Sequence, residues 1–150
     1  MGNPCPWLQL QRTVRFGDTD AAGVMHFHQL LRWCHEAYEE SLQRFGISAA
    51  ELFPRPGRTL PVALPIVHCS ADFFAPIACG DALKIELIPD QLEAGCFEVS
   101  YLFQAKDAQE PSRLLARGLT CHRAISLPGR QRCEVPAILQ AWLGATEAPT

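Results

Sequence analysis

The chain has 150 residues, of which 48% are hydrophobic and 19% are charged, and its formal net charge is -3 at pH 7. This size and balance fit one compact globular domain with a real core. The negative charge argues against a general nucleic-acid-binding protein, and no apolar run is long enough to predict insertion into a membrane.

The first predicted elements are a strand, a loop and a long helix. Apolar and polar residues alternate over 8–16, which predicts a half-buried strand whose apolar face only Arg12 interrupts. Apolar residues then recur at helical spacing over 27–45, and Gly46 follows where a left-handed cap is favoured. A capping-box pattern at 48–51 predicts a short second helix.

The rest of the chain reads as strands. From residue 65 onward the apolar period is two, which predicts strands at 66–74, 83–87, 97–103 and 115–125. Turn residues at 76–81, 89–95 and 107–111 separate them, and the short gaps favour antiparallel neighbours. A terminal helix is expected near 135–143, with Ile138, Leu139 and Trp142 pointing inward.

This order of elements predicts an α+β domain in which one antiparallel sheet covers a single helix. A sheet of this kind leaves part of the helix and its own outer face uncovered. We therefore expect a homodimeric unit, assembled further into a homotetramer.

The segment 16–27 is the strongest candidate for chemistry. It sets two carboxylates, Asp18 and Asp20, in a small-residue loop just ahead of the long helix. The residues before that helix are Val24, Met25 and His26, and none of them is a favoured cap for its first N–H groups. An open helix start suits an oxyanion, and a nearby carboxylate can act as a nucleophile or base, so the pattern favours acyl chemistry.

Seven cysteines are scattered along the chain, without a C-x-x-C pair, at Cys5, Cys34, Cys69, Cys79, Cys96, Cys121 and Cys133. We interpret them as reduced, mostly buried small residues of a cytoplasmic protein, an expectation that agrees with the lack of a signal-peptide pattern at the start. No metal site or cofactor is predicted.

The chain resembles the hotdog-fold acyl-CoA thioesterases, within them the 4-hydroxybenzoyl-CoA thioesterase family. The motif at 15–24, the strand and turn at 71–76 with Gly80-Asp81, and the element order carry this resemblance over about 8–126. It implies a five-stranded antiparallel sheet wrapped around one long helix, with 127–150 as a C-terminal extension that holds a short helix. The segment 32–39 is also similar to the cyanobacterial subgroup that hydrolyses 1,4-dihydroxy-2-naphthoyl-CoA in phylloquinone biosynthesis.

The resemblance also assigns roles in the loop. The second carboxylate of the D-x-D pair is the catalytic one in the family, so Asp20 inherits that role, while we interpret Asp18 as structural. The backbone N–H that faces the thioester oxygen corresponds to Phe27. Gly23 either lets the backbone approach the ligand or supplies a positive φ. His26 and His28 are expected to support the loop and not to bind a metal.

Substrate contacts are predicted from residue type alone. Trp33 and Tyr38, with His35, are expected near an apolar acyl cleft at a subunit boundary. Five arginines and no acidic residue lie between Pro111 and Cys133. Coenzyme A, which is part of the substrate and not a cofactor, brings phosphates that arginine binds in forked geometry, and we select Arg123 and Arg130 for this role.

Several alternatives stay open. Glu36 on the long helix is the rival catalytic carboxylate, because another branch of hotdog thioesterases takes its carboxylate from there. The acyl group could also be 4-hydroxybenzoyl-type, aliphatic or bound to a carrier protein. A hotdog dehydratase and a non-catalytic acyl-CoA-binding subunit are the competing classes of function.

Overall fold

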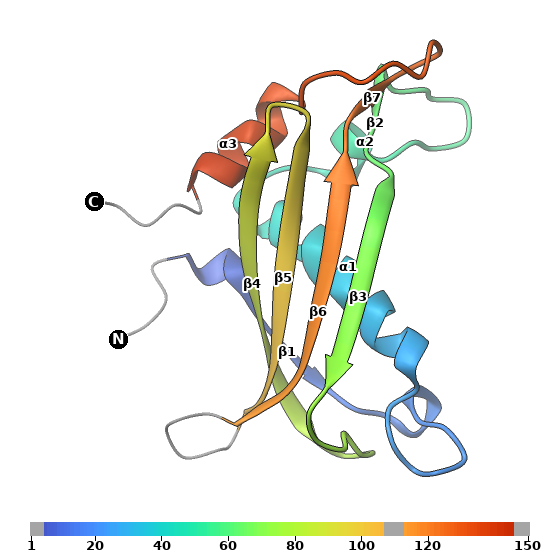
Figure 1. Ribbon diagram of the computed structural model, residues 1–150, viewed down its shortest axis with the longest axis vertical. Coiled ribbons are helices and arrows are strands. Elements are labelled where there is room, and N and C mark those ends of the chain that lie inside the picture. The colour runs from blue at the N-terminus through green and yellow to red at the C-terminus, as the bar shows by residue number, and fades with distance from the viewer. Residues whose placement is uncertain (1–4, 107–112, 146–150) are drawn as a thin grey trace.

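A five-stranded antiparallel sheet lies across one long helix in the computed structural model, which describes residues 5–106 and 113–145 (Figure 1). The strands follow one another across the sheet as β1 (Gln9–Thr13), β4 (Ala82–Glu93), β5 (Cys96–Ala105), β6 (Leu114–Arg123) and β3 (Ile66–Phe73). This is the hotdog arrangement, and the α+β class predicted from the sequence is confirmed.

The long helix α1 (Phe27–Phe45) buries one face against the sheet. It ends at Gly46, whose φ of 118° is left-handed and whose N–H donates to the carbonyls of Leu42 and Gln43 at 3.1 Å. Both bounds agree with the sequence prediction. The buried side chains recur every three or four residues and are Leu30, Trp33, Cys34, Ala37, Tyr38, Ser41 and Leu42.

Helix and sheet approach each other closely where Gly118 of β6 faces Cys34 of α1. A Cβ atom at Gly118 would overlap the Cys34 Sγ, and the ring of Tyr101 lies just beyond. Cys34 is fully buried. The missing side chain at Gly118 therefore makes the room in which α1 packs on β6.

Shorter elements complete the fold. They are the 3₁₀ turns η1 (Pro6–Leu8) and η2 (Phe16–Asp18), the helices α2 (Ala49–Leu52) and α3 (Ala137–Ala145), and the strands β2 (Val62–Ala63) and β7 (Ile125–Ser126). The capping box predicted for α2 is present. In α3, Leu139 and Trp142 are buried as predicted, and the Trp142 Nε1–H donates to Ser41 Oγ at 3.1 Å.

The structure differs from the predicted strands in three respects. β4 runs through Pro89 and Asp90, because beyond Glu86 its outer edge has no strand partner and a proline nitrogen can face that edge. Phe16 is 83% exposed and lies outside β1. The two-residue strands β2 and β7 pair with each other in a second sheet that the sequence did not predict. The predicted turn at 107–111 lies outside the described residues.

The edge strand β3 is open along most of its length. On its other side it pairs only with β6, and the side chains of Ile66, Val67, Phe73 and the adjoining Phe74 are all exposed. A free edge with apolar side chains is a surface on which another strand can pair.

A hydrogen-bonded chain of polar groups crosses the core between β5 and β6. Tyr101 Oη lies 3.0 Å from Thr120 Oγ1, which lies 2.8 Å from His122 Nε2, and the His122 ring also bonds the carbonyl of Leu64. Burial, with a smaller contribution from the charge of His35, lowers the pKa of His122 to about 4. The imidazole is neutral at pH 7, so its second nitrogen donates to Leu64 and Nε2 accepts from Thr120.

This low pKa predicts acid sensitivity. An unfolded histidine binds its proton near pH 6.5, whereas the folded His122 does so only near pH 4, so the unfolded state gains protons first as the pH falls. We expect the free energy of unfolding to fall by about 2 kcal/mol between pH 7 and pH 5 from this group. Urea unfolding of the wild type and of His122→Gln at pH 7 and pH 5 tests this prediction. The variant is expected to be less stable at pH 7, but its free energy of unfolding should fall less from pH 7 to pH 5 than that of the wild type. An equal fall in the free energy of unfolding of both proteins would show that His122 does not cause the acid sensitivity.

Candidate active site

The loop that carries the two carboxylates is a miniature hairpin that folds back to the start of α1. Asp20 N–H donates to the Val24 carbonyl, and His26 N–H donates to the Asp18 carbonyl, both at 2.9 Å. Met25 N–H bonds the carbonyl of Ile77 at 2.7 Å, which fixes the loop to the turn after β3. Both carboxylates are therefore held beside the first turn of α1.

Asp18 is fully occupied in holding this loop. Its Oδ2 accepts from the Arg15 N–H and its Oδ1 accepts from Gln29 Nε2 of α1, each at 2.8 Å. The side chain is half-buried. These bonds agree with the structural interpretation made from the sequence.

Asp20 differs from Asp18 because one of its carboxylate oxygens accepts no hydrogen bond from the described residues. Its Oδ1 accepts from the Ala22 N–H at 2.8 Å, no hydrogen bond within the described part of the chain uses Oδ2, and the residue is exposed. The Gly23 N–H closes the turn on the Asp20 carbonyl at 3.0 Å. Gly23 has a φ of 83°, so the turn itself requires a glycine.

The start of α1 is uncapped, as the sequence predicted. His26 occupies the cap position in an extended conformation, and its side chain makes no capping hydrogen bond. Within the described residues, the amides of Phe27 and His28 have no acceptor. The positive end of the helix dipole is therefore open to an anion or a polarised carbonyl oxygen.

The rings of His26 and His28 lie against each other at a tilt of 60° beside this group of amides. The rings of His26 and His28 have centroids 4.0 Å apart, and the ring of Phe27, which is 65% exposed, lies next to them. His26 Nδ1 is buried without a hydrogen-bond partner. In the described ranges, no three His, Cys, Asp or Glu side chains are grouped as a metal site would require.

Trp33 and Tyr38 are core residues, which corrects the expectation that they line an acyl cleft. Only 5% of Trp33 and 1% of Tyr38 is exposed. The Tyr38 ring packs at 4.8 Å from His122 and at 5.9 Å from Trp142, in the interior. Both residues belong to the face of α1 that the sheet covers, which residue type alone did not indicate. His35 alone of the three lines a small, mostly apolar pocket of about 250 Å³.

The arginines chosen for coenzyme A lie far from Asp20 in the same chain. Arg123 ends β6 and Arg130 lies in the following loop, at the top of Figure 1, whereas the loop 16–26 lies at the bottom. Arg123 is half-buried and its Nη1 lies 3.7 Å from Glu93 Oε2. The sequence did not single out Arg55 and Arg58, which are exposed in the loop beside Arg130's end of the sheet.

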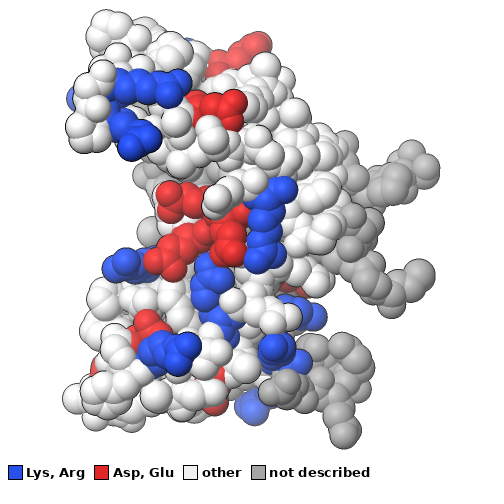
Figure 2. Space-filling view, turned by 180° about the vertical axis from the view of Figure 1, so that it is seen from behind, with Lys and Arg blue, Asp and Glu red and all other residues white. Residues whose placement is uncertain are grey.

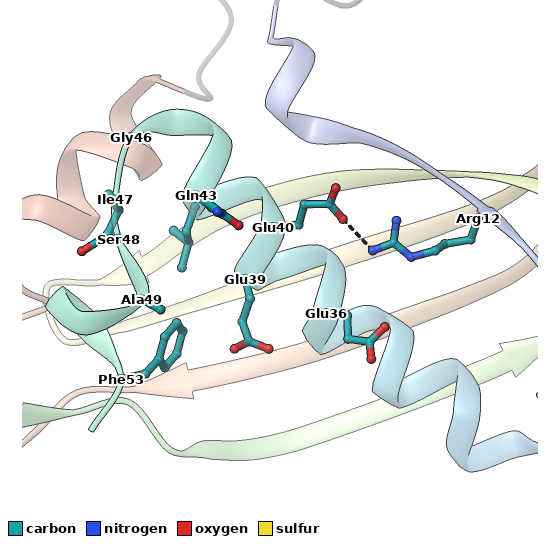
Figure 3. A pocket seen from close by; sticks show the side chains of 11 residues that line it. Arg12, Glu36, Glu39, Glu40, Gln43, Gly46, Ile47, Ser48, Ala49 and Phe53 are labelled. Carbon is teal, nitrogen blue, oxygen red and sulfur yellow. Dashed lines mark hydrogen bonds and ion pairs between the residues drawn. The ribbon is translucent and has the colours of Figure 1, made fainter. Parts of the chain in front are cut away.

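Glu36, the alternative catalytic carboxylate, forms an ion pair on the surface of α1. Glu36 pairs with Arg32 Nε at 3.1 Å, and Glu39 pairs with His35 Nδ1 at 3.0 Å. Both side chains line an open groove of about 630 Å³ beside the Glu40–Arg12 pair (Figure 3). Pairs at a spacing of four on a helix surface are what the sequence interpretation expected of these glutamates.

Comparison with known proteins agrees with this geometry. Residues 14–143 match the family model of the Thioesterase-like superfamily. The chain is 56% identical, over 93% of its length and 91% of the relative, to the 1,4-dihydroxy-2-naphthoyl-CoA hydrolase of Synechococcus sp. strain CC9311. It is likewise 56% identical to the enzyme of that name from strain RCC307, over 89% of this chain and 98% of the relative.

A solved structure extends the comparison to three dimensions. The 1,4-dihydroxy-2-naphthoyl-CoA thioesterase from Synechocystis superposes with a TM-score of 0.83 at 38% identity, covering 95% of this chain and 98% of that one. The family match and the superposition therefore agree on the fold. The chain belongs to the Thioesterase-like superfamily.

Proposed function

We propose that the chain hydrolyses acyl-CoA thioesters at the loop 16–26 and the start of α1. The observation that carries this proposal concerns Asp20 Oδ2, which accepts no hydrogen bond from the described residues and lies on the same hairpin as an uncapped helix start. A carboxylate and an oxyanion site suffice for this reaction because a thiolate leaves readily and needs little help from an acid.

The roles follow from the chemistry. The Phe27 N–H donates to the thioester carbonyl oxygen and stabilises the negative charge that develops there. Asp20 either attacks the carbonyl carbon, giving a mixed anhydride that water then cleaves, or removes a proton from the attacking water. On both routes the C–S bond breaks, the thiolate takes up a proton, and the acyl group leaves as a carboxylate. After a single turnover in ¹⁸O-water, label in Asp20 would establish the covalent route, because water that attacks the Asp20 carbonyl of the anhydride leaves its oxygen there and the water-activation route does not.

The substrate we propose is 1,4-dihydroxy-2-naphthoyl-CoA, which places the chain in phylloquinone biosynthesis. The relatives named for this activity support the assignment. Three exposed aromatic side chains also support it: Phe27 begins α1, Phe73 ends β3, and Phe74 follows Phe73. The loop 16–26 is bonded to the turn after β3, which keeps it close to this end of the strand. Flat aromatic rings favour such surroundings.

A panel of thioesters tests the proposal. Release of free thiol is followed with 1,4-dihydroxy-2-naphthoyl-CoA, 4-hydroxybenzoyl-CoA, an aliphatic acyl-CoA and an acyl carrier protein ester. The highest kcat/KM is expected for the naphthoyl ester. A preference for another ester would reassign the substrate. Enoyl formation from a hydroxyacyl ester without thiol release would indicate a dehydratase, and tight binding without turnover an acyl-CoA-binding subunit.

The working unit that we propose is a homodimer joined along β3, with the homotetramer as its further assembly. The open edge of β3 and its exposed apolar side chains support this pairing. Val67 is 56% exposed on this edge, and a lysine there should block the approach of a second strand.

Val67→Lys is therefore expected to be a monomer by light scattering. Its rate of thioester hydrolysis should be at least about tenfold lower than that of the wild type, because we expect the second subunit to contribute residues that line the active site. Ile88→Lys is the matched control, since Ile88 is a similarly exposed apolar residue on β4, away from this edge. A dimeric Val67→Lys variant would contradict the proposed interface.

The remaining parts of the proposal concern the setting of the reaction. We propose that the enzyme works without a metal or cofactor, in the cytoplasm, with coenzyme A entering only as part of the substrate. None of the described helices is both long and apolar enough to cross a bilayer. Dialysis against a chelator should leave thiol release unchanged.

A further inference from the structure

Two cysteines of the sheet hold their sulfur atoms in contact. Cys96 begins β5 and Cys121 lies near the end of β6, and their Sγ atoms are 3.5 Å apart. Neither cysteine is in a disulfide. The reaction proposed above uses neither thiol, so the contact between them calls for an explanation of its own.

The strand register explains why the two thiols meet. Phe97 of β5 is directly opposite His122 of β6, and their buried rings stack with centroids 4.6 Å apart. Side chains alternate between the two faces of a sheet, so Cys96 and Cys121, which adjoin this pair along their strands, belong to the face away from the core. They lie diagonally across the Phe97–His122 pair, a separation that side chains on neighbouring strands can bridge.

The pair is remote from the candidate active site. The outer face of the sheet is turned toward the viewer in Figure 1, with α1 behind it. Figure 2 shows the molecule from the helix side, where acidic side chains gather at its middle. Cys96 and Cys121 lie at the end of the sheet where β4 turns into β5, whereas the loop 16–26 lies at the other end. A reaction at the two sulfurs therefore leaves the surroundings of Asp20 unchanged.

The geometry allows a bond between the two sulfurs with little movement. An S–S bond is about 2.05 Å long, so the Sγ atoms must approach each other by about 1.5 Å. Cys96 lies at the end of a hairpin, next to an irregularity in the pairing of β4 with β5 between Gln91 and Glu93. Backbone at the end of a strand adjusts over such a distance more readily than backbone in the middle of a sheet.

Exposure decides the order in which the two thiols react. Cys121 is half-buried, whereas only 3% of Cys96 is exposed, so a reagent from solution reaches Cys121 first. Burial, followed by the hydrogen bond with Cys96, raises the pKa of the Cys121 thiol to about 11. The thiolate is the form that attacks a disulfide, so the reaction is slow at pH 7 and faster in mildly alkaline solution.

We propose that Cys96 and Cys121 are a modification site that forms a reversible disulfide between β5 and β6, with a low-molecular-weight disulfide such as oxidised glutathione as the oxidant. The Cys121 thiolate attacks one sulfur of the small disulfide, which forms a mixed disulfide and expels one thiolate. Cys96 then gives up its proton and attacks the Cys121 sulfur, which forms the protein disulfide and releases the second thiol. The protein loses two electrons and two protons, and the small disulfide is reduced to two thiols.

The disulfide stabilises the fold and leaves the chemistry alone. In the unfolded chain it turns the segment 97–120 into a closed loop and so restricts its freedom, whereas the folded strands are already neighbours. The urea midpoint of the oxidised protein should therefore lie about 1 M above that of the reduced protein. The value of kcat for the naphthoyl-CoA ester should be the same in both, because Asp20 lies at the other end of the sheet.

Oxidation of a variant without exposed thiols tests the proposal. Cys69 and Cys79 are exposed and react with any oxidant, so serine replaces both in the background variant Cys69→Ser/Cys79→Ser. Oxidised glutathione at about pH 8.5 should remove two free thiols and lower the mass by two hydrogens, with no glutathione attached. Peptide mapping without reduction should find Cys96 joined to Cys121, and dithiothreitol should restore both thiols.

Three serine variants of this background identify the sulfurs. Cys121→Ser should keep all its thiols, because the sulfur that reacts first is missing. Cys96→Ser should stop at a mixed disulfide with glutathione on Cys121, because the second sulfur is missing. Cys133→Ser is the matched control and should still form the disulfide, since Cys133 is also half-buried at this end of the sheet, with its N–H bonded to the Ala124 carbonyl.

Refolding from urea in a glutathione redox buffer removes the delay that burial imposes. A pair that stays reduced after such refolding, a disulfide between other cysteines, or a urea midpoint that falls on oxidation would each overturn the inference. None of these results bears on thioester hydrolysis, which Asp20→Asn tests separately.

Discussion

Asp20→Asn is expected to lower kcat for thioester hydrolysis by about 10³-fold or more, while KM stays within about threefold of the wild type. The amide has nearly the same size, and its oxygen can still accept the Ala22 N–H bond that orients the side chain. It is neither a nucleophile nor a base, so only the chemical step is lost. Steady-state thiol release, with unfolding curves to verify the fold, measures the effect.

Two controls make this result specific to Asp20. Asp18→Asn should retain most of kcat but unfold more easily, because Asp18 holds the Arg15 N–H and Gln29 by its two oxygens. Glu36→Gln should stay near the wild type, since Glu36 is engaged with Arg32 on the surface of α1. Turnover that survives in Asp20→Asn and is lost in Glu36→Gln would move the catalytic role to the helix.

Gly118→Ala is expected to have the largest effect on stability, a loss of about 3 kcal/mol in the free energy of unfolding. The new methyl group would overlap Sγ of Cys34, whose short side chain lies on a buried face of α1. Cys34 cannot turn aside as a long side chain would, so α1 must move away from β6 and loosen the core. Urea unfolding monitored by circular dichroism gives the value.

The cause can be isolated by removing the atom that the methyl group meets. Cys34→Ala alone should cost about 1 kcal/mol, as a small buried side chain is lost. In the double variant the methyl group added at position 118 fills the space left by Sγ, so Gly118→Ala/Cys34→Ala should be more stable than Gly118→Ala. If the loss of stability in the double variant equals the sum of the losses in the two single variants, the contact with Cys34 is not the cause of the effect of Gly118→Ala.

Much of the fold was predictable because it depends on local patterns. The period of apolar residues located α1, and Gly46 and the capping box at Ser48 located its end and the start of α2. What the sequence could not predict depends on neighbours distant in the chain. Pro89 was read as a turn signal, but it continues β4 because β1 leaves that part of the edge unpaired. The pairing of β2 with β7 is non-local in the same way.

In the candidate site too, the features that depend on a short segment were predicted, and those that depend on residues distant in the chain were not. The uncapped start of α1 was predicted from a short segment and is present, and the hydrogen bonds of Asp18 agree with the structural interpretation of that residue. Trp33 and Tyr38 were chosen for the acyl cleft from residue type, which could not tell that both are buried in the core. The closeness of the loops 53–61 and 127–132 could not be predicted either, because only the fold brings these two segments together.

The exposed oxygen of Asp20 has a consequence for the end of the catalytic cycle. The incoming thioester is neutral at its carbonyl, whereas the acid that hydrolysis leaves behind is an anion. Once the cycle restores Asp20 as a carboxylate, two like charges lie beside one helix start that can favour only one of them. In the mechanism that we propose, repulsion between these two charges favours release of the acid, so the atoms to which we assign the cleavage would also promote product departure.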